Sequence, residues 1–392
     1  MDWQSAELSD SKGLKIPDRW LHLYYYEALN ILFRFENALR IFVYVILKRE
    51  LGKDWDLAAV SDGATIRTET RKRIAQAREH GYLGDEVTSP VLYLNSGELT
   101  QILISDAYWR YFAGYFKATK AVVLTKLQEI GTVRNSLAHF RPVKQDDVDL
   151  IKQNSKHVLL EIERCLIQIS TIANVVPTNS TEPWYKELKS IGSKHLTTSL
   201  YFSRDQEWVR IELIYPIATL VKNLYGEHFC SFKVTNLQTL QLLRQYQAIR
   251  DNCIYVSEDQ ISAQFNDDFS IAAYKPVSII LAKKTLNKVY EDISTAIRDI
   301  AVKVESETAL LLEDNLACGE LIDSQTGHAI PREGQDSNKY WSFSMDNLKT
   351  SVSGIEEVEF WGQRSHYHDD FVAATARYPW MPSTVSKPNW FD

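Results

Sequence analysis

The stretch Val133-Arg134-Asn135-Ser136-Leu137-Ala138-His139-Phe140-Arg141-Pro142 gathers two arginines, an amide and a histidine at the end of an apolar-periodic segment. Apolar residues recur at helical spacing before it, so we predict a helix that begins near residue 117. We expect Pro142 to end this helix, because proline lacks the N–H that another turn needs. The stretch therefore predicts polar side chains displayed at a helix end.

The spacing of these side chains decides which of them can act together. Asn135 and His139 are four residues apart, so they share a helix face and the amide can hold the imidazole in one tautomer. Arg134 and Arg141 are seven apart and share another face. Arg134 and His139 lie about 140° apart around the axis, so one straight helix does not bring both to one phosphate. Two such helices meeting across a two-fold axis would do so. A solvated helix end is the alternative interpretation.

The same motif resembles the signature of HEPN domains, an arginine and a histidine separated by four to six residues. Two upstream segments, Glu36-Asn37-Ala38-Leu39-Arg40 and Leu94-Asn95-Ser96-Gly97-Glu98-Leu99, are similar to the same family, so the resemblance covers roughly residues 20–175. It implies a dimeric, metal-independent ribonuclease. Many members of the family act as toxins or antiviral effectors, although others have lost catalysis. It also implies catalytic roles for Arg134 and His139, with Asn135 as a companion and Glu36 on an inner helix facing the motif.

The composition is that of a folded protein without overall attraction to nucleic acid. The chain has 392 residues, 45% of them hydrophobic and 24% charged, with a net charge of −7. An RNA site would therefore be a local basic patch on an acidic protein. Four scattered cysteines, without a C-x-x-C pair, argue against a zinc knuckle or a disulfide framework and favour a reducing compartment. The polar start of the chain does not resemble a signal peptide, so we expect a cytoplasmic protein.

The apolar stretch from residue 20 to residue 47 is long enough to span a bilayer, but it carries charges at its centre. Each central charge costs about 2.5–3.5 kcal/mol in a membrane, so we predict a helix buried in a bundle or a dimer interface. Glu36 and Arg40 are four residues apart and can neutralise each other there. Two interpretations of Glu36 follow: an internal ion pair only, or a carboxylate that orients Arg134.

Residues 64–80 form a basic segment in which Arg67, Arg71 and Arg78 fall within about 40° on one helical face. Together with Arg141 they are the predicted RNA-binding residues, because arginine side chains contact phosphates. A solvated helix face is the alternative.

We predict a mainly α fold with three parts. An N-terminal HEPN-like helical bundle occupies residues 1–178 and ends at a break rich in proline, serine and threonine. A mixed α/β or α+β sensor or regulatory domain follows over residues 179–322, and an aromatic-rich extension over residues 323–392 packs back on the body.

Within the second part, alternating residues predict strands near 208–215, 229–234 and 253–256, and helical spacing predicts a long helix over 279–304. Residues 243–255 faintly echo the first motif, with Tyr255 in place of histidine. A degenerate second HEPN-like unit is therefore an alternative to a small α/β or α+β module. A polar, glycine-bearing loop is expected from Asp323 to Asn338.

Other catalytic motifs are weak. His366, His368 and Asp370 would share one face of a strand and could bind a metal, but no distant histidine or cysteine partner is evident, so a surface strand or loop is the preferred interpretation. The sequence has no glycine-rich phosphate loop, no G-x-S-x-G and no H-E-x-x-H. We therefore predict no cofactor and no metal site.

The sequence is compatible with two functions. The first is a metal-independent endoribonuclease, a toxin or abortive-infection effector, that cleaves RNA through attack by the 2′-OH and works as a homodimer. Its expected partners are RNA, a second copy of the chain and a separate antitoxin or regulatory protein, without membrane association. The alternative is a non-catalytic HEPN-like module that binds RNA, a nucleotide or a protein.

Overall fold

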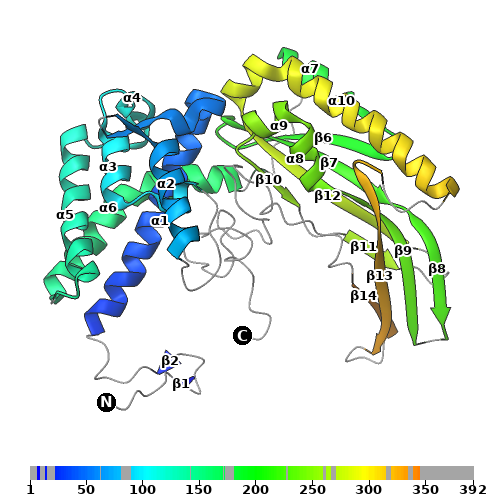
Figure 1. Cartoon of the computed structure of the whole chain (residues 1–392), viewed down its shortest axis with the longest axis horizontal. Helices are drawn as coiled ribbons and strands as arrows, with labels where there is room; N and C mark the ends of the chain where they lie inside the picture. Colours follow the sequence, from blue (N-terminus) through cyan, green and yellow to red (C-terminus); the bar gives the residue numbers. More distant parts are fainter. Residues whose placement is uncertain are drawn as a thin grey trace. The chain divides into compact units, whose positions relative to one another are not determined.

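The computed structural model divides the chain into two compact units, each described here by itself (Figure 1). The first unit comprises Met1–Leu47, Asp56–Lys72 and Val91–Leu166, and the second comprises Lys48–Trp55, Arg73–Pro90 and Ile167–Asp392. The structure describes residues 7–8, 14–15, 23–61, 63–80, 90–141, 143–170, 172, 181–226, 228–258, 262–265, 271–314, 319–333 and 339–344.

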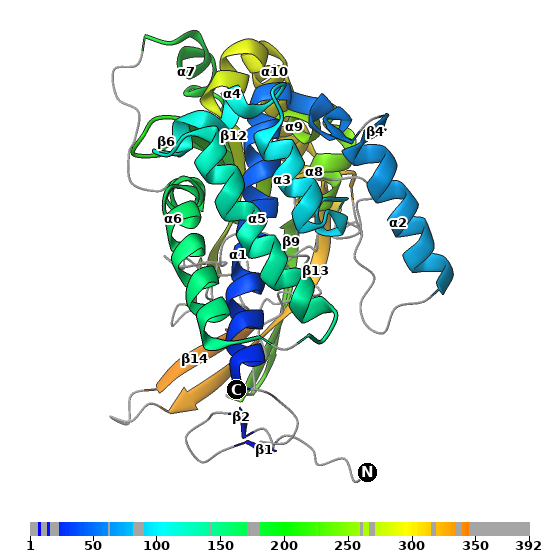
Figure 2. The ribbon, with the colours of Figure 1, turned by 90° about the vertical axis from the view of Figure 1, so that its left-hand side faces the viewer.

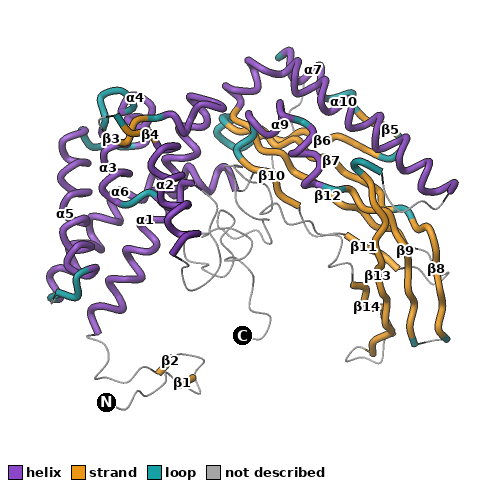
Figure 3. The backbone as a smooth tube through the Cα atoms, viewed as in Figure 1, coloured by secondary structure: helices purple, strands orange, loops and turns teal. Residues whose placement is uncertain are grey.

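The first unit is mainly helical, whereas the second combines helices with the two large sheets (Figure 3). The long helices that contribute to the first unit are α1 (Leu23–Leu51), α5 (Lys120–Ala138) and α6 (Gln145–Ser170). Shorter elements accompany them: β3 (Ala59–Ser61), β4 (Ala64–Thr65), α2 (Ile66–His80), α3 (Ser96–Ile104) and α4 (Trp109–Phe112). The 3-10 helices are η1 (Gly52–Leu57), η2 (Pro90–Tyr93) and η3 (Ala113–Tyr115), and a minimal hairpin joins β1 (Glu7–Leu8) to β2 (Leu14–Lys15).

Helix α1 is the centre of the first unit's core. Residues 41–47 are all at most 2% exposed, because α1 is apolar around its whole circumference at this level. The Phe42 ring packs against Phe112 and Tyr115 at centroid distances of 5.6 and 5.2 Å. No helix in the described part of the chain combines the length and apolar composition that crossing a membrane requires.

Helices α3 and α5 lie side by side in the same unit (Figure 2). Helix α5 buries a single stripe, because Val123, Leu127, Ile130, Val133 and Leu137 recur at spacings of three and four residues. Its other faces stay available for polar residues.

The second unit contains two antiparallel sheets. Within the described residues, six strands form the order β10-β12-β7-β6-β5 with β11 on β12, and four form the order β14-β13-β9-β8. Their bounds are β5 Gly192–Ser193, β6 Leu196–Phe202, β7 Trp208–Ile217, β8 Thr219–Tyr225, β9 Phe229–Leu237, β10 Tyr255–Glu258, β11 Ser262–Phe265, β12 Ile271–Ala282, β13 Ile322–Glu333 and β14 Lys339–Ser344. The helices are α7 (Pro183–Leu188), α8 (Thr239–Gln245), α9 (Gln247–Asn252) and α10 (Lys283–Asp314).

Helix α10 runs along strands of both sheets (Figure 1). The buried hydroxyls of Tyr215 on β7 and Thr308 on α10 are hydrogen-bonded at 3.2 Å. Burial raises the pKa of the Tyr215 phenol, so it stays protonated and keeps this bond.

Lys275 is a buried lysine that forms an ion pair within one sheet and hydrogen bonds to the other. Lys275 on β12 donates from Nζ to the Leu237 carbonyl at 2.6 Å and to Asn236 Oδ1 at 2.9 Å, both on β9. The same Nζ lies 3.0 Å from Glu258 Oε1 on β10, and the Thr239 hydroxyl also donates to this carboxylate. The side chains of Lys275 and Glu258 are 0% and 1% exposed. Burial lowers the pKa of Lys275, and the neighbouring Glu258 carboxylate opposes that effect.

The predicted fold class, mainly α with a helical bundle, is wrong. The molecule is a mixed helix-and-strand protein, because two large antiparallel sheets occupy the second unit. The predicted helix over 279–304 is displaced: β12 continues to Ala282 and α10 begins at Lys283. The loop expected from Asp323 is instead mostly strand β13, which pairs with β9 and β14. Strands do occupy the segments expected near 208–215, 229–234 and 253–256.

The three-part division at residues 178 and 322 stays a prediction. The segment that echoes the first motif spans the end of α8, all of α9 and the first residue of β10. Its Tyr255 is a core residue, 4% exposed, whose hydroxyl donates to the Ile169 carbonyl at 3.2 Å.

Replacing Gly319 with alanine is expected to destabilise the second unit by about 1–3 kcal/mol. A Cβ there would lie 2.5 Å from Oε2 of Glu307, whose carboxylate accepts the N–H groups of Glu320, Leu321 and Ile322 at 2.8–3.1 Å. Displacing the carboxylate leaves these donors without their acceptor. Equilibrium denaturation would measure the loss.

The matched control is Gly131→Ala on α5, where nothing lies within 4 Å of the new Cβ. It should stabilise the protein slightly, because alanine favours a helix more than glycine does. Equal effects of the two substitutions would contradict the role assigned to Glu307.

Candidate functional site

The motif-bearing helix α5 ends at Ala138, before Pro142, by a backbone turn at Phe140. The N–H of Phe140 donates to the Leu137 carbonyl at 3.0 Å and that of Arg141 to the Ser136 carbonyl at 2.8 Å. This is the Schellman pattern, whose left-handed position is usually glycine. Phe140 occupies it with φ of 54°, which costs a non-glycine residue about 1–2 kcal/mol. Pro142 lies outside the described residues.

A carboxylate on α1 anchors the arginine of the motif. Glu36 Oε2 lies 3.7 Å from Arg134 Nε and accepts the Ser96 hydroxyl at 2.5 Å. The other oxygen, Oε1, is paired with Arg40 Nη2, as expected from their spacing of four residues. Arg40 also donates from Nε to the Leu94 carbonyl at 3.0 Å and from Nη1 to Asn37 Oδ1 at 3.0 Å.

This cluster of Glu36, Arg40 and Arg134 carries one net positive charge, because two guanidinium groups share one carboxylate. The Glu36 side chain is only 14% exposed, whereas that of Arg134 is 37% exposed. Glu36 approaches Arg134 from the Nε side, so the terminal nitrogens can still take a second anion in the planar geometry that suits phosphate. The cluster can therefore bind an anion without losing its internal pairing.

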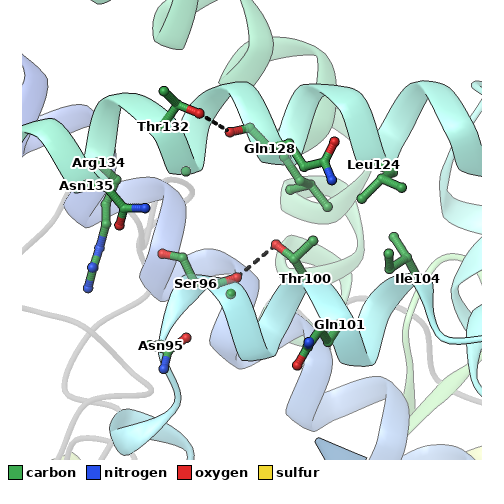
Figure 4. A pocket seen from close by; sticks show the side chains of 13 residues that line it. Asn95, Ser96, Thr100, Gln101, Ile104, Leu124, Gln128, Thr132, Arg134 and Asn135 are labelled. Atoms are coloured by element: carbon green, nitrogen blue, oxygen red, sulfur yellow. Dashed lines mark hydrogen bonds between the residues drawn. The ribbon is translucent and has the colours of Figure 1, made fainter. Parts of the chain in front are cut away.

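Arg134 and Asn135 stand at one end of a groove of about 850 Å³ between α3 and α5. Figure 4 shows them opposite Asn95 and Ser96 at the beginning of α3. Asn95 is the N-cap of α3 and forms a capping box with Glu98, which fixes the position of Ser96 in the first turn. The remaining lining is uncharged, so Arg134 supplies the formal charge of the groove.

His139 caps α5 rather than extending it. Its backbone N–H donates to the Asn135 carbonyl at 3.2 Å, and its ring is exposed. The expected bond from the Asn135 amide to the imidazole does not form among the residues that the structure describes. His139 is therefore accessible to a molecule bound at the end of α5.

The predicted RNA-binding arginines do not gather around this cluster as one face. Arg141 lies beyond the left-handed turn, so it does not share a face of α5 with Arg134. Arg67 forms a two-pronged ion pair with Asp56, with both N–O distances at 2.7 Å. Arg71 is exposed on α2, and Arg78 lies on the same helix with its side chain outside the described residues.

Two contributors to the site were missed from the sequence. Asn95 is the N-cap of α3, which leaves the Ser96 hydroxyl to Glu36. The Leu94 carbonyl, which holds Arg40, is a backbone group that no side-chain pattern reveals. The Asn95-x-x-Glu98 capping box was a visible signal for the first of these.

The metal hypothesis has no support among the described residues, which hold no cluster of three or more histidine, cysteine or acidic side chains suited to a metal ion. His366, His368 and Asp370 lie outside them.

Comparisons of the chain with known protein families, with characterised proteins and with solved structures give no match. The function is therefore inferred from the residues of the cluster and their geometry.

Proposed function

We propose that the first unit is a metal-independent endoribonuclease of HEPN type that works as a homodimer. The observation that carries this proposal is the partly exposed Arg134, held by Glu36, which also pairs with Arg40, on the helix that the exposed His139 caps. A guanidinium prepared for an anion and a proton-exchanging imidazole are the two groups that cleavage of an RNA linkage needs without a metal.

The proposed reaction uses the RNA's own nucleophile. His139 of one protomer takes the proton from the ribose 2′-OH, whose oxygen attacks the adjacent phosphorus. The bond from phosphorus to the 5′-oxygen breaks, and that oxygen leaves with a proton supplied by solvent or by the second imidazole. Arg134 of the other protomer neutralises the charge that develops on the phosphate oxygens. The products are a 2′,3′-cyclic phosphate and a 5′-hydroxyl.

The biological setting remains part of the proposal. A toxin or antiviral role, a separate antitoxin and a regulatory function for the second unit follow from the resemblance to HEPN domains. We propose a cytoplasmic location because the cysteines are few and scattered, and Cys165, Cys230 and Cys253 are buried in the protein.

The test is to incubate the purified full-length protein with mixed RNA in excess EDTA and to map the product ends. We expect cleavage that is unaffected by EDTA and leaves cyclic phosphate ends. Cleavage that requires a divalent metal, or that leaves a 5′-phosphate, would exclude this mechanism.

A second candidate is a non-catalytic module that binds RNA, a nucleotide or a protein, and the net charge of −7 favours it. Binding of RNA without cleavage in the same assay would support it.

A further inference from the structure

We propose that the four-stranded sheet of the second unit binds the unpaired bases of a single-stranded nucleic acid. This site goes beyond the proposed function, which concerns the first unit, and neither depends on the other. Along β9, buried residues alternate with partly exposed ones, so the sheet has one packed face and one open face. Cys230 and Phe232 on the packed face are at most 1% exposed. The open face, to which Phe229, Ser231 and Lys233 belong, is therefore the one that a ligand can reach.

Three aromatic rings form a row across this open face. Phe229 on β9 stacks on His328 of the neighbouring β13, with a centroid distance of 5.2 Å and an interplanar angle of 29°. Tyr225 on β8 is paired with Phe229, and their ring centroids are 5.6 Å apart. Tyr225 is 59% exposed, and Phe229 and His328 are partly exposed. The row thus offers accessible ring surfaces of the kind on which nucleobases stack.

Positive side chains lie on both sides of this row of rings. The strand register pairs His328 with Ser231 and Thr326 with Lys233, so Lys233 follows on the open face about 7 Å beyond His328. Arg332 is exposed and lies on the same face of β13, four residues or about 13 Å from His328 in the opposite direction. No residue described on the open face is acidic, and its other exposed residues are Asn223, Thr326, Ile330 and Ser342. A chain with a net charge of −7 thus carries a locally positive face.

The chemistry of the open face favours a single strand over other partners. Polar residues such as Asn223 and Ser231 interrupt its apolar residues, whereas a protein interface buries an apolar core. A duplex keeps its bases stacked on each other, so a protein ring contacts a base face only after a pair has opened. Aromatic rings flanked by cations instead match sites for single strands, where bases stack on the rings and cations contact the phosphates.

The position of the rings within the sheet agrees with this ligand. Strands β13 and β9 are the two central strands of the order β14-β13-β9-β8, and they carry His328 and Phe229 (Figure 1). Aromatic residues on four-stranded sheets stack two or three bases in other RNA-binding proteins. We therefore assign Tyr225, Phe229 and His328 as the stacking residues, with Lys233 and Arg332 as the phosphate contacts.

Binding is best measured in full-length protein that carries Arg134→Ala and His139→Ala, so that the candidate nuclease site neither cleaves nor holds the probe. Fluorescence anisotropy would follow a labelled RNA strand, a DNA strand of the same sequence and the corresponding duplex. Adding Tyr225→Ala should weaken single-strand binding about 5- to 150-fold, the range that one stacked base contributes. It should change duplex binding less than about twofold. Equal affinity for the RNA and DNA strands would show that only bases and phosphates are contacted, and tighter RNA binding would add a contact to the 2′-OH.

Matched controls separate stacking from other effects. Tyr225→Phe keeps the ring and should retain the affinity of the parent. Tyr274→Ala removes another exposed tyrosine, 48% exposed on β12 of the other sheet, and should leave binding unchanged. Arg332→Gln should lower the slope of log affinity against log salt concentration by about 0.7, the contribution of one phosphate contact to a single strand.

Several outcomes would overturn the inference. These are no measurable binding of single strands by the parent, unchanged affinity in Tyr225→Ala, or an equal loss in Tyr274→Ala. A switch from dimer to monomer in Tyr225→Ala would instead assign the rings to an interface between copies. The proposed function fails separately: a wild-type protein that binds single strands through Tyr225 but never cleaves RNA would retain the sheet site and remove the nuclease.

Discussion

Replacing His139 with alanine is expected to lower the rate of RNA cleavage about 10²- to 10⁴-fold, the usual contribution of a positioned general acid or base. The exposed ring can reach a substrate, and its loss should not disturb folding, because the ring packs against none of the described core. Single-turnover cleavage in EDTA would measure the effect. His157→Ala is the matched control, because it removes another exposed histidine from the same unit, one that contacts Lys126 at 3.2 Å.

Mixing two inactive variants tests whether the site is shared between protomers. If Arg134 of one copy works with His139 of the other, a dimer of Arg134→Ala with His139→Ala retains one intact site. Random reassociation then restores about a quarter of the wild-type activity, because half of the dimers are mixed and each has one of two sites. No restoration would place both groups of a working site on a single protomer. If the His139→Ala variant by itself cleaved RNA at the wild-type rate, the proposed mechanism would be excluded.

The second large effect concerns stability. Replacing Lys275 with methionine is expected to lower the free energy of unfolding of the second unit by about 3–5 kcal/mol, because Glu258 remains buried without its cation. The effect should be local to the strands that Lys275 contacts. Hydrogen exchange of β9, β10 and β12 would therefore report it directly.

A double variant distinguishes loss of the pair from loss of packing. Adding Glu258→Gln to Lys275→Met removes the uncompensated charge and should recover part of the stability. Lys303→Met removes a partly exposed lysine that pairs with Glu320 at 3.2 Å, and its effect should be much smaller. An equally small effect of Lys275→Met would mean that the buried contacts of Lys275 contribute little to the stability of the second unit.

Local patterns in the sequence predicted the helices of the first unit well, and the sheets of the second unit less well. Helix α5 follows from one apolar stripe, and the pairing of Glu36 with Arg40 follows from their spacing. The end of β12 was missed because its apolar residues continue into a helical pattern, and short apolar runs do not distinguish strand from helix. Strand β13 was missed because its polar sequence resembles a loop, while pairing on both sides stabilises it as a strand.

Local patterns in the sequence also identified only part of the candidate site. Arg134, His139 and Glu36 were selected from the motif and its resemblance to HEPN domains. The contact of Ser96 with Glu36 joins residues 60 positions apart, and no local pattern encodes such a distance. The early end of α5 depends on a left-handed phenylalanine, which propensity argues against. Long-range contacts and unfavourable backbone conformations were thus the features that the sequence did not predict and the structure revealed.

The order of the candidate site and the two sheets along the chain has a consequence for synthesis. Every residue of the candidate site lies before residue 142, whereas strand β9 must wait for β13, whose paired residues Leu237 and Ile322 are 85 positions apart (322 − 237). Non-local strand pairs form slowly, and domains fold as they leave the ribosome. A nascent chain can therefore complete the cluster before the two sheets of the second unit are synthesised. If that unit restrains a toxic activity, the producing cell needs another inhibitor during each round of translation.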